Sequence, residues 1–156
     1  MAHRNKAEGW DGADRRDPAS VLVVNEDAAA RELLVRFLGQ AGFTVSGASG
    51  DKDALARMTE ELPRCVVLDM QAGGVGSSLK VLDQIRTHHD RRINTARVVL
   101  CAPGRTNRGF SFQSGADAFL VRPYHLNDLI EHVTDVITRP QDDRARHRRD
   151  ELTKHE

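Results

Sequence analysis

The chain has 156 residues, of which 39% are hydrophobic and 29% charged, and its 23 Lys and Arg residues equal its 23 Asp and Glu residues. This length and composition suit one globular domain, and the balanced charge argues against nucleic acid or a membrane surface as a partner. No apolar run approaches the roughly 18 residues of a membrane span, and the polar N-terminus resembles no secretion signal.

The N-terminal residues 1–19 are polar and aperiodic, which predicts a disordered arm. From residue 20 onward, short apolar runs alternate with segments of helical period. The predicted strands are the five runs 21–24, 43–45, 65–68, 97–101 and 118–121. Most of them are continuously apolar, as expected of parallel strands that are covered on both faces.

Segments of helical period separate these strands. Helices are predicted over 28–41, 51–62 and 125–138, and another begins at Ser77 or Ser78. The segment 104–114 is the weakest helix, since its central glycine costs about 1 kcal/mol relative to alanine. Five strands alternating with five helices predict an α/β fold, a doubly wound parallel sheet in a single domain over 20–138.

The C-terminal residues 139–156 form a tail that is dense in charges of both signs. Its basic stretch could contact nucleic acid, but no aromatic residue or DNA-binding motif accompanies that stretch. A solvated, frayed helix is the preferred interpretation.

The two cysteines, Cys65 and Cys101, lie inside apolar runs and lack the spacing of a metal site. Buried, unpaired thiols are typical of a reducing compartment. The sequence therefore predicts a cytoplasmic protein.

Polar residues follow several of the predicted strands. The first strand runs into Asn25 and Glu26, the third ends at Asp69, and the fifth runs into Arg122. In doubly wound sheets, ligands gather beyond the C-terminal ends of the strands. Neighbouring carboxylates favour a divalent cation, and hard oxygens suit Mg²⁺. A carboxylate nucleophile, a metal and a basic group are the components of phosphoryl transfer.

Four segments resemble the successive strand-and-loop signatures of bacterial response-regulator receiver domains: VLVVNEDAAARELL, CVVLDM, RVVLCA and GADAFLVRPYHLNDLI. The resemblance implies a five-stranded sheet of flavodoxin-like topology and an aspartate that a histidine kinase phosphorylates. Asp69 matches this phosphoacceptor. Glu26 matches an acidic Mg²⁺ ligand, and Gln71 matches the position that offers a backbone carbonyl to the metal, with Asp69 as the remaining ligand. Phe119 matches the aromatic rotamer position on the fifth strand.

Several positions depart from the family pattern. Asn25 stands where the first of two adjacent acids is expected, so Mg²⁺ binding should be weaker, and Asn25 itself should be structural. Cys101 replaces a Thr or Ser, and a thiol is only a weak donor. Arg122 replaces a Lys, and its planar fork is expected to pair with unphosphorylated Asp69. The loop 70–78 lacks the family's proline.

Two hypotheses of function follow. The first is a stand-alone receiver that takes a phosphoryl group on Asp69 from a histidine kinase or phosphotransfer protein and signals by docking, since few residues follow Pro140. The second is a phosphorylation-independent pseudo-receiver that acts as an interaction module. The face formed by 104–138 is the predicted surface for a downstream partner or a homodimer. An enzyme is not expected, because acids occupy the loop where a flavin phosphate would want neutral donors.

Overall fold

The computed structural model describes residues 17–71 and 75–154, which contain a parallel sheet of five strands in the order β2-β1-β3-β4-β5. This is the flavodoxin-like order. The strands are β1 (Ser20–Val24), β2 (Thr44–Ala48), β3 (Cys65–Leu68), β4 (Arg97–Ala102) and β5 (Ala118–Val121). The predicted fold class is confirmed, and the second strand extends three residues beyond its predicted end.

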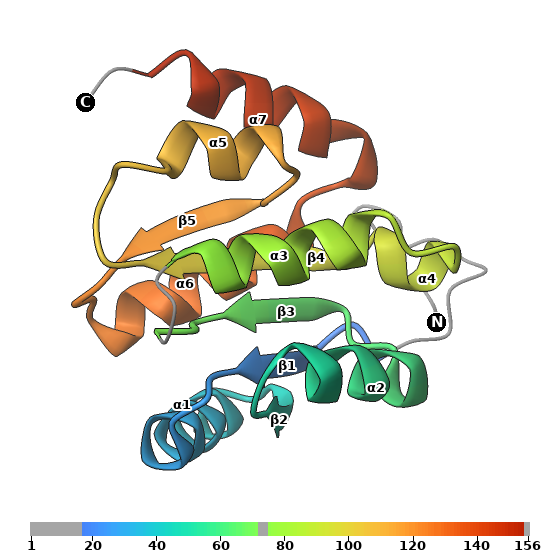
Figure 1. Ribbon diagram of the computed structural model, residues 1–156, viewed down its shortest axis with the longest axis vertical. Helices are drawn as coiled ribbons and strands as arrows, with labels where there is room; N and C mark the ends of the chain where they lie inside the picture. Colours follow the sequence, from blue (N-terminus) through green and yellow to red (C-terminus); the bar gives the residue numbers. More distant parts are fainter. Residues whose placement is uncertain (1–16, 72–74, 155–156) are drawn as a thin grey trace.

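Helices cover both faces of the sheet (Figure 1). They are α1 (Ala28–Gln40), α2 (Asp51–Glu61), α3 (Val75–Arg86), α4 (Arg91–Asn94), α5 (Arg108–Gln113), α6 (Leu126–Thr138) and α7 (Arg144–Leu152), with a 3-10 turn, η2, over Gln141–Asp143. Buried side chains of α2, α3 and α4 pack on one face of the sheet, and those of α1 and α6 pack on the other.

Local signals explain several helix ends. The Asp27 side chain caps α1 by accepting a hydrogen bond from the Ala30 N–H at 2.8 Å. The chain after α1 turns at Gly42, whose φ of 105° suits glycine. The weak 104–114 segment is a six-residue helix, α5, as its central glycine suggests. The short helix α4 was not predicted, and Asp90 caps it through the Arg92 N–H.

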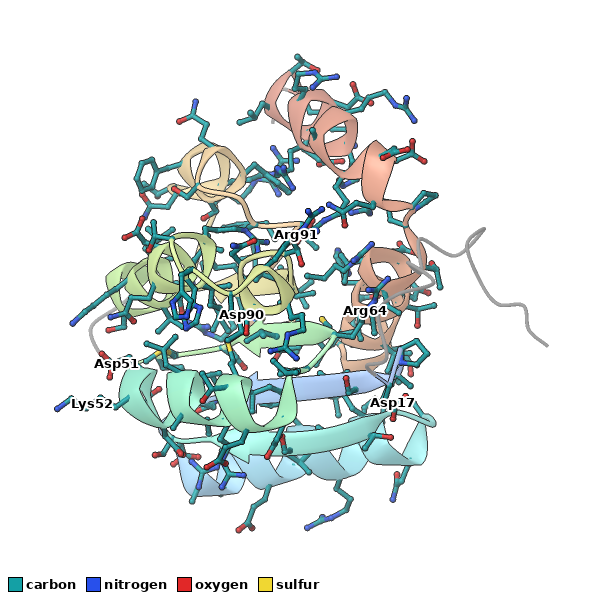
Figure 2. The ribbon with its side chains drawn as sticks, turned by 90° about the vertical axis from the view of Figure 1, so that its right-hand side faces the viewer. Asp17, Asp51, Lys52, Arg64, Asp90 and Arg91 are labelled. Atoms are coloured by element: carbon teal, nitrogen blue, oxygen red, sulfur yellow. The ribbon has the colours of Figure 1, made fainter. Side chains whose placement is uncertain are left out.

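Every neighbouring pair of strands is parallel, so the strands run in one direction. Figure 2 shows that Asp17 and Arg64, which precede β1 and β3, lie at one end of the sheet, and that Asp51, which begins α2 after β2, lies at the other. Residues that follow the strands therefore share one edge. Residues 1–16 of the predicted arm and 72–74 of the loop after Asp69 lie outside the described residues.

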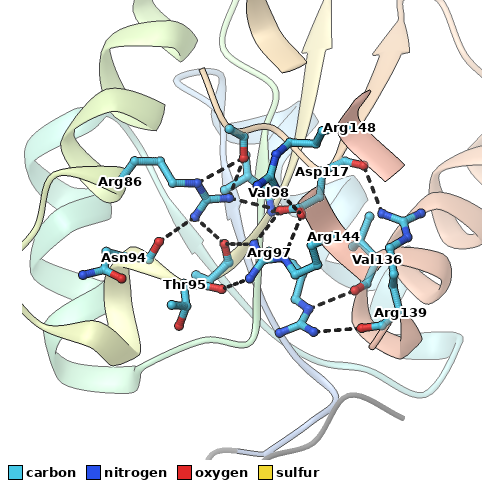
Figure 3. A network of polar contacts seen from close by, with 12 residues as sticks. Arg86, Asn94, Thr95, Arg97, Val98, Asp117, Val136, Arg139, Arg144 and Arg148 are labelled. Carbon is cyan, nitrogen blue, oxygen red and sulfur yellow. Dashed lines mark hydrogen bonds and ion pairs between the residues drawn. The ribbon is translucent and has the colours of Figure 1, made fainter. Parts of the chain in front are cut away.

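The C-terminal tail forms a packed helix, which corrects the expectation of a solvated one. Arg144 of α7 is only 5% exposed, and its Nε donates to Asp117 Oδ1 at 2.9 Å (Figure 3). The His147 ring meets the Phe112 ring of α5 edge-on. The expectation failed because Asp117 is buried, and a buried carboxylate needs cationic partners.

No helix within 17–71 and 75–154 combines the length and the apolar character needed to cross a membrane.

Candidate functional site

The residues that follow β1, β3 and β5 come together because the strands are parallel and in register. Val24 of β1 pairs with Leu68 of β3, and the Asp69 N–H donates to the Val24 carbonyl at 3.0 Å. At the same end of the sheet, between β4 and β5, the Arg122 N–H donates to the Ala102 carbonyl at 2.7 Å. These backbone hydrogen bonds fix the positions of Asp69 and Arg122 just beyond the ends of their strands.

Asp69 lies at the end of the central strand, and side chains of the loop after β5 bind both of its oxygens. It is 3% exposed. Arg122 Nη1 donates to Asp69 Oδ1 at 2.6 Å, so the predicted ion pair is present. The Tyr124 hydroxyl donates to Asp69 Oδ2 at 2.7 Å, a contact that was not predicted. The buried carboxylate is thus held by one cationic and one neutral donor.

Glu26 links the loop after β1 to the loop after β3. Its two carboxylate oxygens accept the backbone N–H of Gln71 at 2.9 and 3.1 Å. The structure therefore brings Gln71, two residues after Asp69, into contact with Glu26 from the loop after β1.

Asn25 is completely buried and organises the start of α1. Its Oδ1 accepts the Asp27 N–H at 2.8 Å, and its backbone carbonyl accepts from Arg31 Nη1 at 2.8 Å. Its side-chain nitrogen has no hydrogen-bond partner among residues 17–71 and 75–154. These contacts agree with a structural part for Asn25 and leave one buried donor at the edge.

Cys101 and Phe119 lie on β4 and β5. Cys101 is fully buried, and burial, followed by the nearby Asp69 carboxylate, raises the pKa of its thiol well above the usual value. The thiol is therefore protonated at neutral pH. Phe119 is partly buried against the core on the α2 and α3 side of the sheet. Its proposed change of rotamer stays a prediction.

A pocket of about 430 Å³ opens beside Asp69, between α1 and the loop after β5. The pocket is mostly apolar, with a few polar side chains among its lining residues. Its lining residues are Ala30, Leu33, Leu34, Asp69, Gln71, Pro103, Arg122, Pro123, Tyr124 and Leu126. The Asp69 carboxylate is therefore reachable from one side of the molecule.

The donor types at this edge fit Mg²⁺, although the described residues hold no group of three His, Cys, Asp or Glu side chains suited to a metal. Glu26 and Asp69 offer carboxylates and Gln71 a carbonyl, and Mg²⁺ needs only one or two carboxylates because it keeps several waters. Each carboxylate already accepts hydrogen bonds from the protein. Mg²⁺ would have to compete with these donors, which predicts weak binding.

The fold is a doubly wound sheet, and a buried aspartate at the end of its central strand pairs with a basic residue after the last strand. This combination is typical of a signalling module of the receiver type. The family model for the response regulator receiver domain matches residues 21–134. The chain belongs to this family.

Individual relatives agree with this assignment. The transcriptional regulatory protein SrrA of Staphylococcus aureus is 28% identical over 122 residues, which cover 78% of this chain and 48% of that protein. The chain thus spans about half the length of the curated relatives it matches.

Two solved structures are similar as well. The response regulator TrrA of Thermotoga maritima, in complex with Mg²⁺ and BeF, is 26% identical with a TM-score of 0.63, covering 75% of this chain and 97% of that one. A response regulator receiver domain protein from Clostridium thermocellum shows the same fold, with a TM-score of 0.66. It is 21% identical, and the match covers 76% of this chain and 94% of that one.

Proposed function

We propose that the protein receives a phosphoryl group on Asp69 from a histidine kinase or phosphotransfer protein and passes the signal on by docking to a partner. The observation that carries this proposal is the buried Asp69 carboxylate at the end of β3, paired with Arg122. Membership of the receiver family supports it. The family is a class of signalling modules, so Asp69 is a site of transfer within a signalling protein.

The chemistry asks little more of the chain than positioning and charge neutralisation. An oxygen of Asp69 attacks the phosphorus of the donor, and the bond from phosphorus to the leaving group breaks with its electron pair. Arg122 has a planar fork that suits a phosphoryl group as well as a carboxylate. Glu26, Asp69 and the Gln71 carbonyl would hold Mg²⁺, which supplies positive charge to the transferring group when bound.

The pocket beside Asp69 supplies the route for the donor. Its apolar wall comes from α1, where Ala30 and Leu34 line it and Leu33 is 49% exposed. An apolar patch of this kind next to a reactive carboxylate suits a protein donor that packs against α1. The two cysteines of the chain are buried and unpaired, which supports a reducing, cytoplasmic setting for this exchange.

The downstream partner, or a second copy of the chain, is proposed to dock on the 104–138 face. Part of this face is already covered, because α7 packs along α5 (Figure 1). Phe110 of α5 is nevertheless 56% exposed, and Leu152 at the end of α7 is 36% exposed. We propose that Phe110 marks the part of this face that remains open to a partner, and that Leu152 of α7 extends the exposed apolar surface beyond residue 138.

A phosphorylation-independent pseudo-receiver is the second candidate. Its supporting observation is that Arg122 and Tyr124 together bind both oxygens of Asp69. In that case the pair is permanent and Asp69 is a structural residue.

Incubation with Mg²⁺ and acetyl phosphate, followed by intact-mass measurement, separates the two candidates. We expect one phosphoryl group on the wild-type chain and none on Asp69→Asn. The matched control Asp83→Asn, which changes an exposed aspartate of α3, should be modified like the wild type. A wild-type chain that gains no mass would favour the pseudo-receiver.

A further inference from the structure

The Tyr124 hydroxyl is the neutral donor that reaches the acceptor carboxylate. It donates to Asp69 Oδ2 at 2.7 Å, while Arg122 takes the other oxygen, Oδ1, at 2.6 Å. Tyr124 follows β5 in the loop that begins with Arg122 and Pro123, and its ring lines the pocket beside Asp69. The two oxygens of Asp69 are therefore distinguished by their partners.

The chemistry of each partner suggests different tasks. Arg122 carries a positive charge, so its guanidinium can bind the carboxylate before the transfer and the phosphoryl group after it. Tyr124 carries no charge, so its bond fixes the direction of the carboxylate without neutralising it. A carboxylate held by Oδ2 presents Oδ1 in one orientation. Orientation of a reacting atom is itself a source of rate in transfer reactions.

Cys101 is poorly suited to the same task. Its thiol is a weak donor, and it is fully buried at the end of β4. Tyr124 and Cys101 are close enough for each to influence the pKa of the other. The phenol of Tyr124 is protonated at neutral pH, because the ordinary pKa of a tyrosine is about 10. The Tyr124 hydroxyl is therefore a good hydrogen-bond donor that lies close to the weak donor of the Cys101 thiol.

We propose that Tyr124 is the positioning residue of the acceptor site: its hydroxyl holds Oδ2 of Asp69, so that Oδ1 forms the bond to phosphorus, and it takes over the donor task that the Cys101 thiol performs poorly. This proposal rests on the proposed function. In the transfer, Oδ1 forms the new P–O bond, and the bond from phosphorus to the donor's leaving group breaks, which is P–N for a phosphohistidine and P–O for acetyl phosphate. The leaving group keeps the electron pair, Oδ2 becomes the acyl oxygen, and Tyr124 keeps its proton throughout.

The first test removes the hydroxyl alone. Tyr124→Phe keeps the ring in the pocket, and we expect the rate of modification by acetyl phosphate with Mg²⁺ to fall about tenfold, in line with the loss of one hydrogen bond to a charged group. The loss should lie in the maximal rate, with little change in the acetyl phosphate concentration that gives half of it. Circular dichroism confirms that the variant is folded.

The second test asks for rescue. In the Tyr124→Phe background, Cys101→Thr places a hydroxyl beside Asp69 and should restore most of the rate. Cys101→Val has the same shape without a hydroxyl and should restore none. In a chain that still has Tyr124, Cys101→Thr should bring a much smaller gain, because the donor is already present.

A third measurement does not depend on phosphorylation. Tyr124 is the single tyrosine of the chain, so isotope-labelled tyrosine gives one ring-carbon NMR resonance at the phenol. We expect this resonance to shift in Asp69→Asn and to stay in place in Asp83→Asn.

The outcomes separate the positioning task of Tyr124 from the proposed phosphoryl transfer to Asp69. A wild-type chain that is modified at the same rate as Tyr124→Phe overturns the positioning task and leaves the proposed function intact, and rescue by Cys101→Val overturns it equally. An unchanged tyrosine resonance in Asp69→Asn refutes the contact itself. A wild-type chain that takes no phosphoryl group refutes the proposed function, and the positioning task falls with it.

Discussion

Asp117 and Arg122 flank the four residues of β5, and each makes an ion pair at its own end of the strand. Asp117 precedes the strand and holds α7 through Arg144, with 2.9 Å between Nε and Oδ1. Arg122 follows the strand and holds Asp69 at 2.6 Å. β5 therefore connects the edge that carries Asp69 to the C-terminal helix, and the ion pairs at its two ends can be tested separately.

Removing the charge of Asp117 should destabilise the protein strongly. The residue is 1% exposed and pairs with Arg144, Arg86 and Arg148 at 2.9, 3.0 and 3.4 Å (Figure 3). Asp117→Asn keeps the size but leaves buried guanidinium groups unpaired, which costs roughly 3–5 kcal/mol. Urea denaturation should show a loss of that size in the free energy of unfolding.

The matched control for this prediction is Asp135→Asn, which changes an exposed aspartate on α6. It should alter the free energy of unfolding by less than about 0.5 kcal/mol. If Asp117→Asn cost no more than this control, the network would not be what holds α7 in place.

Acid should weaken the same network. Burial alone raises the pKa of the Asp117 carboxyl, but the charge and hydrogen bonds of Arg144, with help from Arg86 and the Val98 N–H, outweigh it and lower the pKa from 3.8 to about 2. Since folding depresses this pKa, the contribution to stability is complete above about pH 4 and is lost as pH falls toward 2. The lost contribution is about 2 kcal/mol.

Urea denaturation of the wild type and of Asp117→Asn at several pH values checks this effect. The difference in free energy of unfolding between them should narrow as the pH falls from about 4 to about 2, because protonated aspartate resembles asparagine. A difference that stays constant over this range would show that Asp117 does not titrate there.

The sheet and the meeting of Asp69 and Arg122 at one edge could be predicted from sequence for a physical reason. Strands buried on both faces must be continuously apolar, as 65–68 and 97–101 are, and parallel strands bring their C-terminal ends to one edge. Once the strand ends were placed, Asp69 and Arg122 had to lie at the same edge, and the resemblance to receiver domains added the expectation that they pair across the end of β4. The ion pair between Asp69 and Arg122 forms because a buried carboxylate needs a partner of opposite charge.

Tyr124 and α7 could not be predicted in the same way. A tyrosine two residues after Arg122 can turn toward or away from the edge, and hydrophobic period does not encode the direction of a loop side chain. The charge density of 139–156 is equally typical of a solvated helix and of one that supplies Arg144 to a buried carboxylate. Asp117 lies 27 residues before its partner, and nothing local marks it as buried.

Replacing Arg122 should make Mg²⁺ bind more tightly to the acceptor edge. The guanidinium now occupies Asp69 Oδ1, so a metal has to compete with a positive charge that lies 2.6 Å away. In Arg122→Ala this competitor is gone, and we expect the Mg²⁺ dissociation constant from calorimetry to fall by roughly tenfold. Arg36→Ala, on the exposed side of α1, serves as the control and should leave the constant unchanged.

Modification by acetyl phosphate should fall in Arg122→Ala despite the tighter metal, since the guanidinium that would meet the phosphoryl charge has been removed. Weaker Mg²⁺ binding in this variant would mean that Arg122 supports the metal rather than competing with it.

Restoring the second acid at position 25 should make the fold depend on Mg²⁺. Asn25 is completely buried, and the register places it next to Asp69. Asn25→Asp keeps an oxygen for the Asp27 N–H but adds a negative charge beside the charges of Asp69 and Glu26. Without metal, we expect the free energy of unfolding to fall by about 1–3 kcal/mol, because a buried like charge is unfavourable.

Mg²⁺ should reverse this loss, since the new carboxylate is also a metal ligand and a ligand that binds the folded state stabilises it. Thermal melts with and without Mg²⁺ should therefore show a larger metal-dependent rise in Tm for Asn25→Asp than for the wild type. Asn127→Asp, on the exposed first turn of α6, adds the same charge away from the edge and should show no such gain. An equal rise in all three chains would mean that the added acid does not face the metal, and that Asn25 is not the reason for weak binding.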